Sequence, residues 1–464
     1  MDTIFPDNLG DARGPKYRTV ASCIRTAIAD GTLQAGDRLP PVRDLAWRLK
    51  ITPGTVARAY TVLTDEGLLN AEVGRGTYVA EPKTDRDDDV WGRLTEPQDA
   101  EMVSLFSPRL PDMGQVALMR RALAGVAESP PLDFLNYPTR DAYRPVRQAV
   151  VDWLAVRPLG PVSEDEIVLS HGGQNAISLV LQAVLRGPRP MVLVEDLTYA
   201  GFRRAAETLR ADVQGVAMDE AGVLPEALDA AIRASEAQVF CTSPDVHNPT
   251  GLCTPIERRK ELAEVCRRHG VQILEDDCYC VGQARAPHYR MLLPGQSWYV
   301  SSLSKSLTPA LRFGYAIAPA ERAADLRRVS EHGFFGLARP LADIAHRLLA
   351  DPESRAICDR VRERIGEYVE VAVNVLGGFD LTWSRDVSFL WLRLPSGWRA
   401  AAFCRAAEGQ GVQIRSADEF ALRDGRAPHA VRIAINGQVS LRSFEAAMQR
   451  LRSLLDNPPE QIMV

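Results

Sequence analysis

The sequence lacks the spacings and runs that mark several classes of protein. Its eight cysteines include no Cys-x-x-Cys pair and its seven histidines no His-Glu-x-x-His spacing, so we expect no metal site and scattered, reduced thiols. No apolar run approaches the ~20 residues that a membrane-spanning helix needs, and residues 1–10 lack the basic start and apolar core of a signal peptide. These absences predict a cytoplasmic protein with no membrane partner.

An excess of positive charge is also missing. The net charge is −5 over 464 residues, of which 46% are hydrophobic and 25% charged. This balance is typical of a globular protein and excludes a basic surface over the whole molecule, so any nucleic-acid-binding surface must be local. A chain of this length is too long for one ordinary core, and two or three domains are expected.

The first eighty residues have the pattern of a helix-turn-helix. Apolar side chains recur at helical spacing over residues 17–28 and again over residues 42–49. Thr52 is a good N-cap for a third helix, with Pro53 at its first position. Two short helices joined by a tight turn can place the later one in the major groove of DNA.

A hairpin is expected after these helices. Residues 73–79, Val-Gly-Arg-Gly-Thr-Tyr-Val, place Arg75 at the tip, as in a wing suited to a minor groove or a phosphate. Residues 15–80 hold nine Lys or Arg against six Asp or Glu, a local balance of +3. A small helical module used only for packing is the alternative.

Three segments of this region resemble the winged helix-turn-helix of GntR-family regulators. They are residues 36–46 (GDRLPPVRDLA), 55–60 (TVARAY) and 74–79 (GRGTYV). The resemblance implies a DNA-binding domain over residues 1–80, whose partner is double-stranded operator DNA. It implies DNA contacts from Arg43, Thr52, Thr55, Arg58, Gly74 and Arg75.

Residues 81–100 have the composition of a linker. They contain seven acidic and three basic residues and hardly any periodic apolar pattern. A charged segment of this kind extends by self-repulsion. We expect it to separate the first domain from a second over residues 101–464.

In the second domain, apolar strands alternate with amphipathic helices. This alternation predicts an α/β fold with a mostly parallel sheet covered on both faces, whose ligands gather beyond the carboxyl ends of the strands. The expected strands are 167–169, 191–194, 238–240 and 271–274, and the expected helices are 176–185, 201–209 and 256–268.

One lysine lies among serines. Ser301, Ser302 and Ser304 precede Lys305 closely, and Arg312 follows seven residues later. A lysine forms a Schiff base only when its amine can lose a proton, and nearby hydroxyls and an arginine suit a phosphate. The segment therefore fits an anchor for pyridoxal phosphate, although by itself it also fits a solvated lysine in a serine-rich loop.

Other strand ends carry groups that fit the same cofactor. Gly172-Gly173-Gln174 opens a helix, which would present backbone N–H groups to a phosphate, although a plain strand-to-helix turn is the usual explanation. Tyr199 could lie flat against an aromatic ring or belong to the core. Asn248, in Asn-Pro-Thr-Gly, presents its amide at the sheet edge.

Two further charged groups follow or occupy apolar strands. The acids 275–277 come directly after residues 271–274 and are costly to bury unless partnered; a pyridinium nitrogen is one such partner. Arg432 lies inside the apolar segment 430–436, where its planar fork suits a carboxylate.

The order of these groups along the chain resembles the fold-type I aminotransferases of the aspartate aminotransferase superfamily, over residues 137–455. The resemblance implies Lys305 as Schiff-base lysine and catalytic base, Asp276 against the pyridine nitrogen, and Arg432 on the substrate α-carboxylate. It implies pyridoxal phosphate contacts from Gly173, Gln174, Tyr199, Asn248, Asp276, Tyr279, Ser302, Ser304, Lys305 and Arg312.

A winged helix upstream of such a domain is similar to the MocR-type subgroup of GntR regulators. The resemblance implies a winged helix-turn-helix plus a fold-type I aminotransferase-like domain, with a smaller C-terminal α+β subdomain. It also implies a domain-swapped homodimer and a transcriptional regulator that senses pyridoxal phosphate with an amino-acid effector. The alternative is an active aminotransferase, converting an amino acid to its 2-oxo acid, with an accessory DNA-binding domain.

Overall fold

The computed structural model describes residues 16–34, 36–65, 68–72, 76–80, 102–128, 135–422 and 425–458. The chain divides into two compact units, Met1–Glu96 and Pro97–Val464. The predicted linker, residues 81–100, lies outside the described residues.

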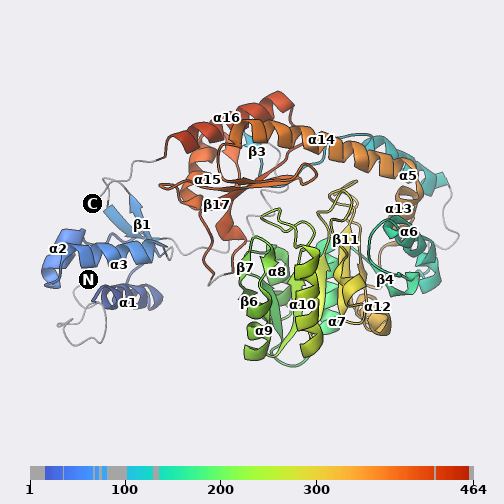
Figure 1. Ribbon diagram of the computed structural model, residues 1–464, viewed down its shortest axis with the longest axis horizontal. Coiled ribbons are helices and arrows are strands. Elements are labelled where there is room, and N and C mark those ends of the chain that lie inside the picture. Colours follow the sequence, from blue (N-terminus) through green and yellow to red (C-terminus); the bar gives the residue numbers. More distant parts are fainter. Residues whose placement is uncertain are drawn as a thin grey trace. The chain divides into compact units, whose positions relative to one another are not determined.

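The first unit contains the three predicted helices and the predicted hairpin (Figure 1). Its elements are α1 (Lys16–Ala29), α2 (Val42–Arg48), α3 (Pro53–Asp65), β1 (Leu69–Glu72) and β2 (Gly76–Val79). Val20, Leu45 and Val56, one from each helix, are fully buried together in one apolar cluster. As predicted, Thr52 caps α3: its Oγ1 accepts a hydrogen bond from the Thr55 N–H at 3.3 Å. The fold of this unit is thus the expected helix-turn-helix with a two-stranded wing.

A seven-stranded sheet forms the centre of the second unit, in the order β4-β12-β11-β10-β9-β5-β6. Only β12 runs antiparallel to its neighbours within this sheet, so the prediction of a mostly parallel sheet is confirmed. The strands are β4 (Ile167–Ser170), β5 (Met191–Glu195), β6 (Asp212–Val216), β9 (Ala237–Thr242), β10 (Gln272–Asp276), β11 (Ser297–Ser302) and β12 (Gly314–Ile317).

Helices cover both faces of this sheet, because successive side chains of its strands are apolar and point to opposite sides. On β5, Val192 and Val194 pack with residues of α7, α8 and α12, whereas Leu193 packs with residues of α9, α10 and α11. These helices are α7 (Gly173–Val184), α8 (Ala200–Thr208), α9 (Pro225–Ala234), α10 (Ile256–His269), α11 (Tyr289–Leu292) and α12 (Ala323–Phe334).

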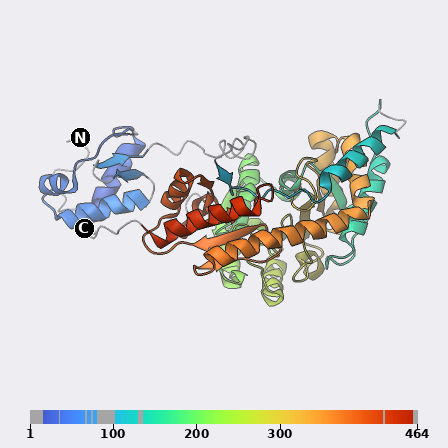
Figure 2. The same cartoon turned by 90° about the horizontal axis from the view of Figure 1, so that it is seen from above.

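A smaller subdomain contains the antiparallel sheet β13-β14-β17-β16. Its long helices α14 and α16 lie side by side along it (Figure 2). The elements are α14 (Glu353–Leu376), β13 (Leu381–Thr382), β14 (Phe389–Arg393), α15 (Ala400–Gly409), β16 (Arg415–Ser416), β17 (Ala430–Ala434) and α16 (Leu441–Asp456). The prediction of a C-terminal α+β subdomain is confirmed.

The remaining α-helices and strands also belong to the second unit. They are β3 (Val103–Ser104), α5 (Gln115–Glu128), α6 (Arg144–Leu154), β7 (Met218–Asp219), β8 (Gly222–Val223), α13 (Arg339–Ala350) and β15 (Val412–Gln413). Within the described residues, no helix combines the length and the apolar character that a bilayer crossing requires.

Candidate functional site

Two of the three consecutive acids at the end of β10 are partnered by the protein itself. Glu275 pairs with Nδ1 of His288 at 2.7 Å. Asp277 accepts a hydrogen bond from the Tyr299 hydroxyl at 2.6 Å and lies 3.6 Å from Nη1 of Arg157. The cost of burying these two carboxylates is therefore offset within the fold.

The middle acid, Asp276, is different. Its Oδ1 accepts one backbone hydrogen bond, from the Cys278 N–H at 3.0 Å, and no cationic side chain pairs with it in the part of the chain that the structure describes. Burial raises the pKa of Asp276, and the negative charges of Glu195 and Glu275 raise it further. A protonated ring nitrogen would supply the missing positive partner.

The two glycines of the turn between β4 and α7 let side chains approach the N-terminus of α7 closely. Gly172 has φ 83°, and a Cβ there would lie 2.9 Å from Nη2 of Arg312; a Cβ on Gly173 would lie 2.5 Å from Sγ of Cys278. The nearby Ser304 Oγ is buried without a hydrogen-bond partner. Backbone N–H groups at a helix N-terminus, a guanidinium and an unpartnered hydroxyl together fit a phosphate.

The other residues predicted at this end of the site lie around the same turn. Ser302 Oγ lies 3.9 Å from the Cβ position of Gly173. A Cβ on Gly201 would lie 2.1 Å from both Oε1 of Gln174 and Cε1 of Tyr199, so the glycine makes space for these two side chains. The Gln174 amide also donates to the Gly201 carbonyl at 2.9 Å.

Lys305 lies in the turn after β11 and is half-buried. Its Nζ is 5.3 Å from the ring centroid of Tyr279. Burial would raise the pKa of Tyr279, but the positive charges of Lys305, Arg432 and Arg415 lower it. The position of Lys305 therefore favours an anchor within a site over a solvated loop lysine.

Arg432 is buried on β17, where its Nη1 donates to Oδ1 of Asn248 at 2.7 Å and its Nη2 to the carbonyl of Phe106 at 3.1 Å. The structure thus brings Asn248 and Arg432 together. Burial lowers the pKa of Arg432 to about 10. Asn248 and Phe106 contribute neutral oxygens and no carboxylate pairs directly with Arg432 among the described residues, so this guanidinium suits an incoming carboxylate.

Several residues near the site were not identified from the sequence. Cys278 borders the glycine turn, and Arg415 lies opposite Arg432 in the register of β16 and β17. His247 holds the Asn-Pro-Thr-Gly turn, with Nδ1 2.6 Å from Oγ1 of Thr250. His247 could have been noticed in the sequence because it precedes Asn248. Arg415 could not, because the sequence does not show which residues pair between strands.

In the first unit, the predicted DNA contacts are distributed over α2 and α3. Arg43 and Arg58 are exposed, and the Arg58 guanidinium lies over the Tyr17 ring at 4.3 Å. Oγ1 of Thr52 and Oγ1 of Thr55 are 2.9 Å apart in the cap of α3. Gly74 and Arg75 lie outside the described residues.

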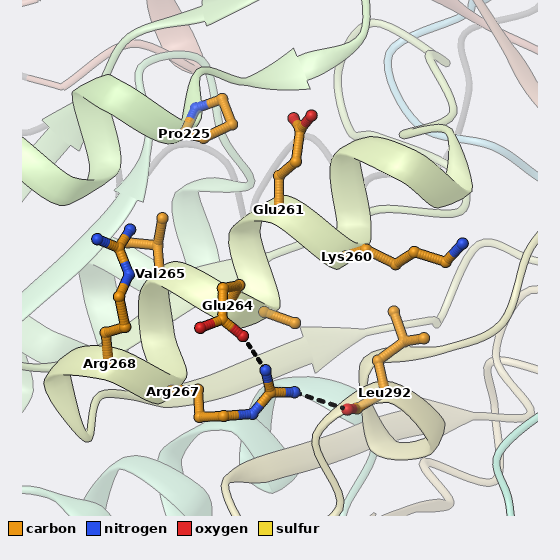
Figure 3. A pocket seen from close by; sticks show the side chains of 9 residues that line it. Pro225, Lys260, Glu261, Glu264, Val265, Arg267, Arg268 and Leu292 are labelled. Carbon is orange, nitrogen blue, oxygen red and sulfur yellow. Dashed lines mark hydrogen bonds and ion pairs between the residues drawn. The ribbon is translucent and has the colours of Figure 1, made fainter.

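A pocket on α10 is not part of this site (Figure 3). It is lined by α10 residues together with Pro225 and Leu292, and none of the predicted site residues lines it. Arg267 pairs there with Glu264 and donates to the Leu292 carbonyl at 3.4 Å. The Arg267 guanidinium therefore already has partners within the protein. We assign no ligand or catalytic role to this pocket.

Comparison with protein families identifies both units. The model described as "Aminotransferase class I and II" matches residues 115–451, and that of "Bacterial regulatory proteins, gntR family" matches residues 16–79. The chain belongs to the aminotransferase class I and II family. It joins a domain of this family to a GntR-type helix-turn-helix.

Two relatives span both units. The uncharacterized HTH-type transcriptional regulator YdeF of Bacillus subtilis is 25% identical, over 97% of this chain and 96% of its own length. The vitamin B6 salvage pathway transcriptional repressor PtsJ of Salmonella typhimurium is 29% identical, over 91% of this chain and 95% of its own.

Among solved structures, the α-aminoadipate aminotransferase LysN of Thermus thermophilus is similar in fold, with a TM-score of 0.67. It is 23% identical and covers 79% of this chain and 96% of its own. An archaeal alanine:glyoxylate aminotransferase gives a TM-score of 0.69 at 22% identity, over 80% and 94%. Family membership and the buried Asp276, which has no cationic partner among the described residues, support pyridoxal phosphate as the cofactor.

Proposed function

We propose that this protein is a DNA-binding transcriptional regulator that senses an amino acid through pyridoxal phosphate attached at Lys305. Asp276 carries this proposal, because a buried carboxylate without a cationic partner requires one, and a pyridinium supplies it. The GntR-type unit supports DNA binding as the output. A regulator of this kind acts on DNA in the cytoplasm.

Each site residue has a distinct task in this proposal. Bound pyridoxal phosphate supplies an aldehyde that condenses with amines and a ring that withdraws electrons. Lys305 supplies the amine that holds it, Asp276 keeps the ring nitrogen protonated, and Tyr199 stacks on the ring. The phosphate is held by Gly173, Gln174, Ser302, Ser304 and Arg312.

The remaining residues take the ring hydroxyl and the effector. Asn248 and Tyr279 bond the ring hydroxyl, and Arg432 binds the α-carboxylate of the amino acid as a bidentate fork. Arg43, Thr52, Thr55, Arg58 and the wing residues Gly74 and Arg75 contact DNA. We further propose a homodimer in which the DNA-binding unit of one chain reaches over the large unit of its partner.

Absorption spectroscopy tests the cofactor part of this proposal. Purified protein mixed with pyridoxal phosphate is expected to show a visible absorption band that the Lys305→Ala variant lacks. The matched control is Lys260→Ala, because Lys260 is exposed on α10, remote from β11. Retention of the band in Lys305→Ala with an unchanged thermal melt would refute the anchor assignment.

A gel shift with DNA from upstream of the protein's own gene tests the regulatory part. We expect a specific complex that weakens with salt, since arginine–phosphate contacts release counterions. Arg58→Ala should weaken it at least about tenfold, a change of roughly 1.4 kcal/mol, whereas Arg393→Ala, on an exposed site of β14, should not. Absence of a salt-sensitive complex with and without pyridoxal phosphate would exclude the regulator.

An active aminotransferase is the second candidate function. The observation that favours it is the placement of Lys305 beside Tyr279 and within the same site as Arg432. Production of a 2-oxo acid from an amino acid, lost in Lys305→Ala, would support turnover; a spectral response to the amino acid without product would support sensing alone.

A further inference from the structure

Two arginines lie side by side on neighbouring strands of the small sheet. β16 and β17 pair antiparallel with Arg415 directly opposite Arg432, and residues in that relation project from the same face of the sheet. The guanidinium carbon of each lies 4.9 Å from the ring centroid of Phe420. Like charges directly opposite each other destabilise a strand pair, and Glu419, which pairs with Arg415, is one carboxylate beside these two cations.

Arg432 forms no ion pair with a carboxylate within the described residues, and burial lowers its pKa although Tyr279 and the negative charge of Glu419 act in the opposite direction. The residue is 1% exposed, its Nη1 and Nη2 donate to neutral oxygens of Asn248 and Phe106, and its Nε is buried without a partner. A buried, incompletely bonded guanidinium of this kind is costly unless a ligand completes it.

Arg415 is held in a fixed position beside it. Its guanidinium lies over two rings, 4.6 Å from the centroid of Phe106 and 4.9 Å from that of Phe420. Glu419 accepts a hydrogen bond from Nε at 3.0 Å and lies 2.8 Å from Nη2. The third nitrogen, Nη1, has no hydrogen-bond partner among the described residues. The side chain is therefore oriented by the protein but keeps one donor nitrogen available.

The charge of Arg415 also acts on the proposed cofactor site. It is one of three positive charges, with Lys305 and Arg432, that lower the pKa of Tyr279 against the effect of burial. In the proposed function, Lys305 is the attachment point and Arg432 takes the α-carboxylate. Arg415 is the one cation of the three that is left without a ligand group.

We propose that Arg415 binds an anionic group on the side chain of the amino acid, so that the site selects amino acids with a second negative charge. This inference rests on the proposed function, because it names the class of amino acid that the same site takes. Nη1 of Arg415 would donate a charge-assisted hydrogen bond to a side-chain carboxylate, which is stronger than the hydrogen bond it can make to a neutral amide oxygen.

Paired amino acids of equal size test this inference. Full-length protein loaded with pyridoxal phosphate is titrated with L-glutamate and with L-glutamine, and the affinity is taken from the change in visible absorption. We expect glutamate to bind at least about tenfold more tightly than glutamine, because loss of one charged hydrogen bond costs about that factor. Equal binding, or a preference for glutamine, would overturn the inference.

Variants of Arg415 then distinguish ligand binding from a purely structural role, in which Arg415 only packs between Phe106 and Phe420 (bracing). Arg415→Gln is expected to remove the preference for glutamate while leaving glutamine affinity within about twofold, and Arg393→Gln, an exposed arginine of the same sheet, to keep it. Equal losses for both amino acids would indicate bracing alone. If Arg415→Gln does not fold, Arg415→Lys, which keeps the charge, must retain a preference for glutamate.

A measurement without the cofactor distinguishes failure of this inference from failure of the proposed function. Glutarate, with two carboxylates, is expected to raise the melting temperature of cofactor-free protein, and butyrate to raise it less. If no amino acid changes the absorption spectrum but glutarate stabilises the protein, the sensing function fails and the two-arginine site stands. If amino acids change the spectrum without regard to side-chain charge and glutarate has no effect, only the two-arginine site fails.

Discussion

Asp276 differs from its two neighbours in what the fold provides for it. Glu275 and Asp277 have a histidine and a tyrosine–arginine pair as partners, whereas Asp276 has only the backbone N–H and the thiol of Cys278 among the described residues. A desolvated carboxylate without a counter-ion has a raised pKa. Its affinity for a protonated ring nitrogen must therefore compete with its affinity for a proton.

This competition predicts a pH dependence. Because the pKa of Asp276 is raised above 3.8 in the folded protein, the carboxylate takes up a proton as the pH falls through that raised value, and cofactor affinity should fall with it. Pyridoxamine 5′-phosphate suits the measurement, since it lacks the aldehyde that reacts with Lys305. Its affinity is expected to decrease as the pH is lowered through the raised pKa of Asp276.

The matched variant is Asp276→Asn, which keeps the size and loses the charge. At pH 7 we expect it to bind pyridoxamine 5′-phosphate at least about tenfold more weakly, since it removes a buried ion pair. The part of the pH dependence that belongs to Asp276 should disappear. If calorimetry shows an unchanged affinity for the variant, Asp276 does not contact the ring nitrogen.

At the scale of elements, the turn from β4 into α7 forms the proposed phosphate site. Gly172 adopts φ 83°, a left-handed conformation that glycine tolerates, and its missing Cβ lets the Arg312 guanidinium lie close to the turn. Gly187 has φ 84°, yet nothing lies within 4 Å of its Cβ position. The two glycines therefore share a backbone requirement and differ in surroundings.

This difference yields a controlled prediction. Gly172→Ala and Gly187→Ala should each cost roughly 1–2 kcal/mol of stability through backbone strain. Only Gly172→Ala should also weaken pyridoxal phosphate, by about tenfold or more, because its Cβ displaces Arg312. Thermal melts and cofactor titrations of both variants check this. If the two variants bind the cofactor with equal affinity, the turn between β4 and α7 does not form part of the phosphate site.

At the scale of the whole molecule, the two units have separate apolar cores. The core of the first unit is built from residues between Val20 and Val79, and the cores of the second from residues beyond Val103. Units with separate cores can unfold in separate steps.

We therefore expect two transitions in a calorimetric scan of the full chain. Pyridoxal phosphate at about 100 times its Kd should stabilise the large unit by about 2.7 kcal/mol and leave the other transition in place. Lys305→Ala should abolish most of this shift. A single transition that moves as a whole with the cofactor would mean that the two units unfold as one.

Much of the fold was predictable from local pattern. Residues 17–28, 42–49 and the Thr52 cap gave the helices of the first unit, because a periodic apolar face and a cap are local properties. The alternation of strand and helix gave the mostly parallel sheet. Element ends shifted by a few residues: α7 begins at Gly173 rather than Ala176, because the left-handed Gly172 allows the helix to start directly after the turn.

The sequence by itself determined which groups stand at the strand ends: Lys305, Asp276 and Arg432 each follow or occupy an apolar strand. Only the tertiary structure decided which of them are free to act. Whether an acid is already neutralised, or an arginine faces a second arginine, depends on partners far away in the chain, such as His288 for Glu275 and Arg415 for Arg432. Which side chains become partners is set by packing and strand register, and the local sequence pattern does not encode these.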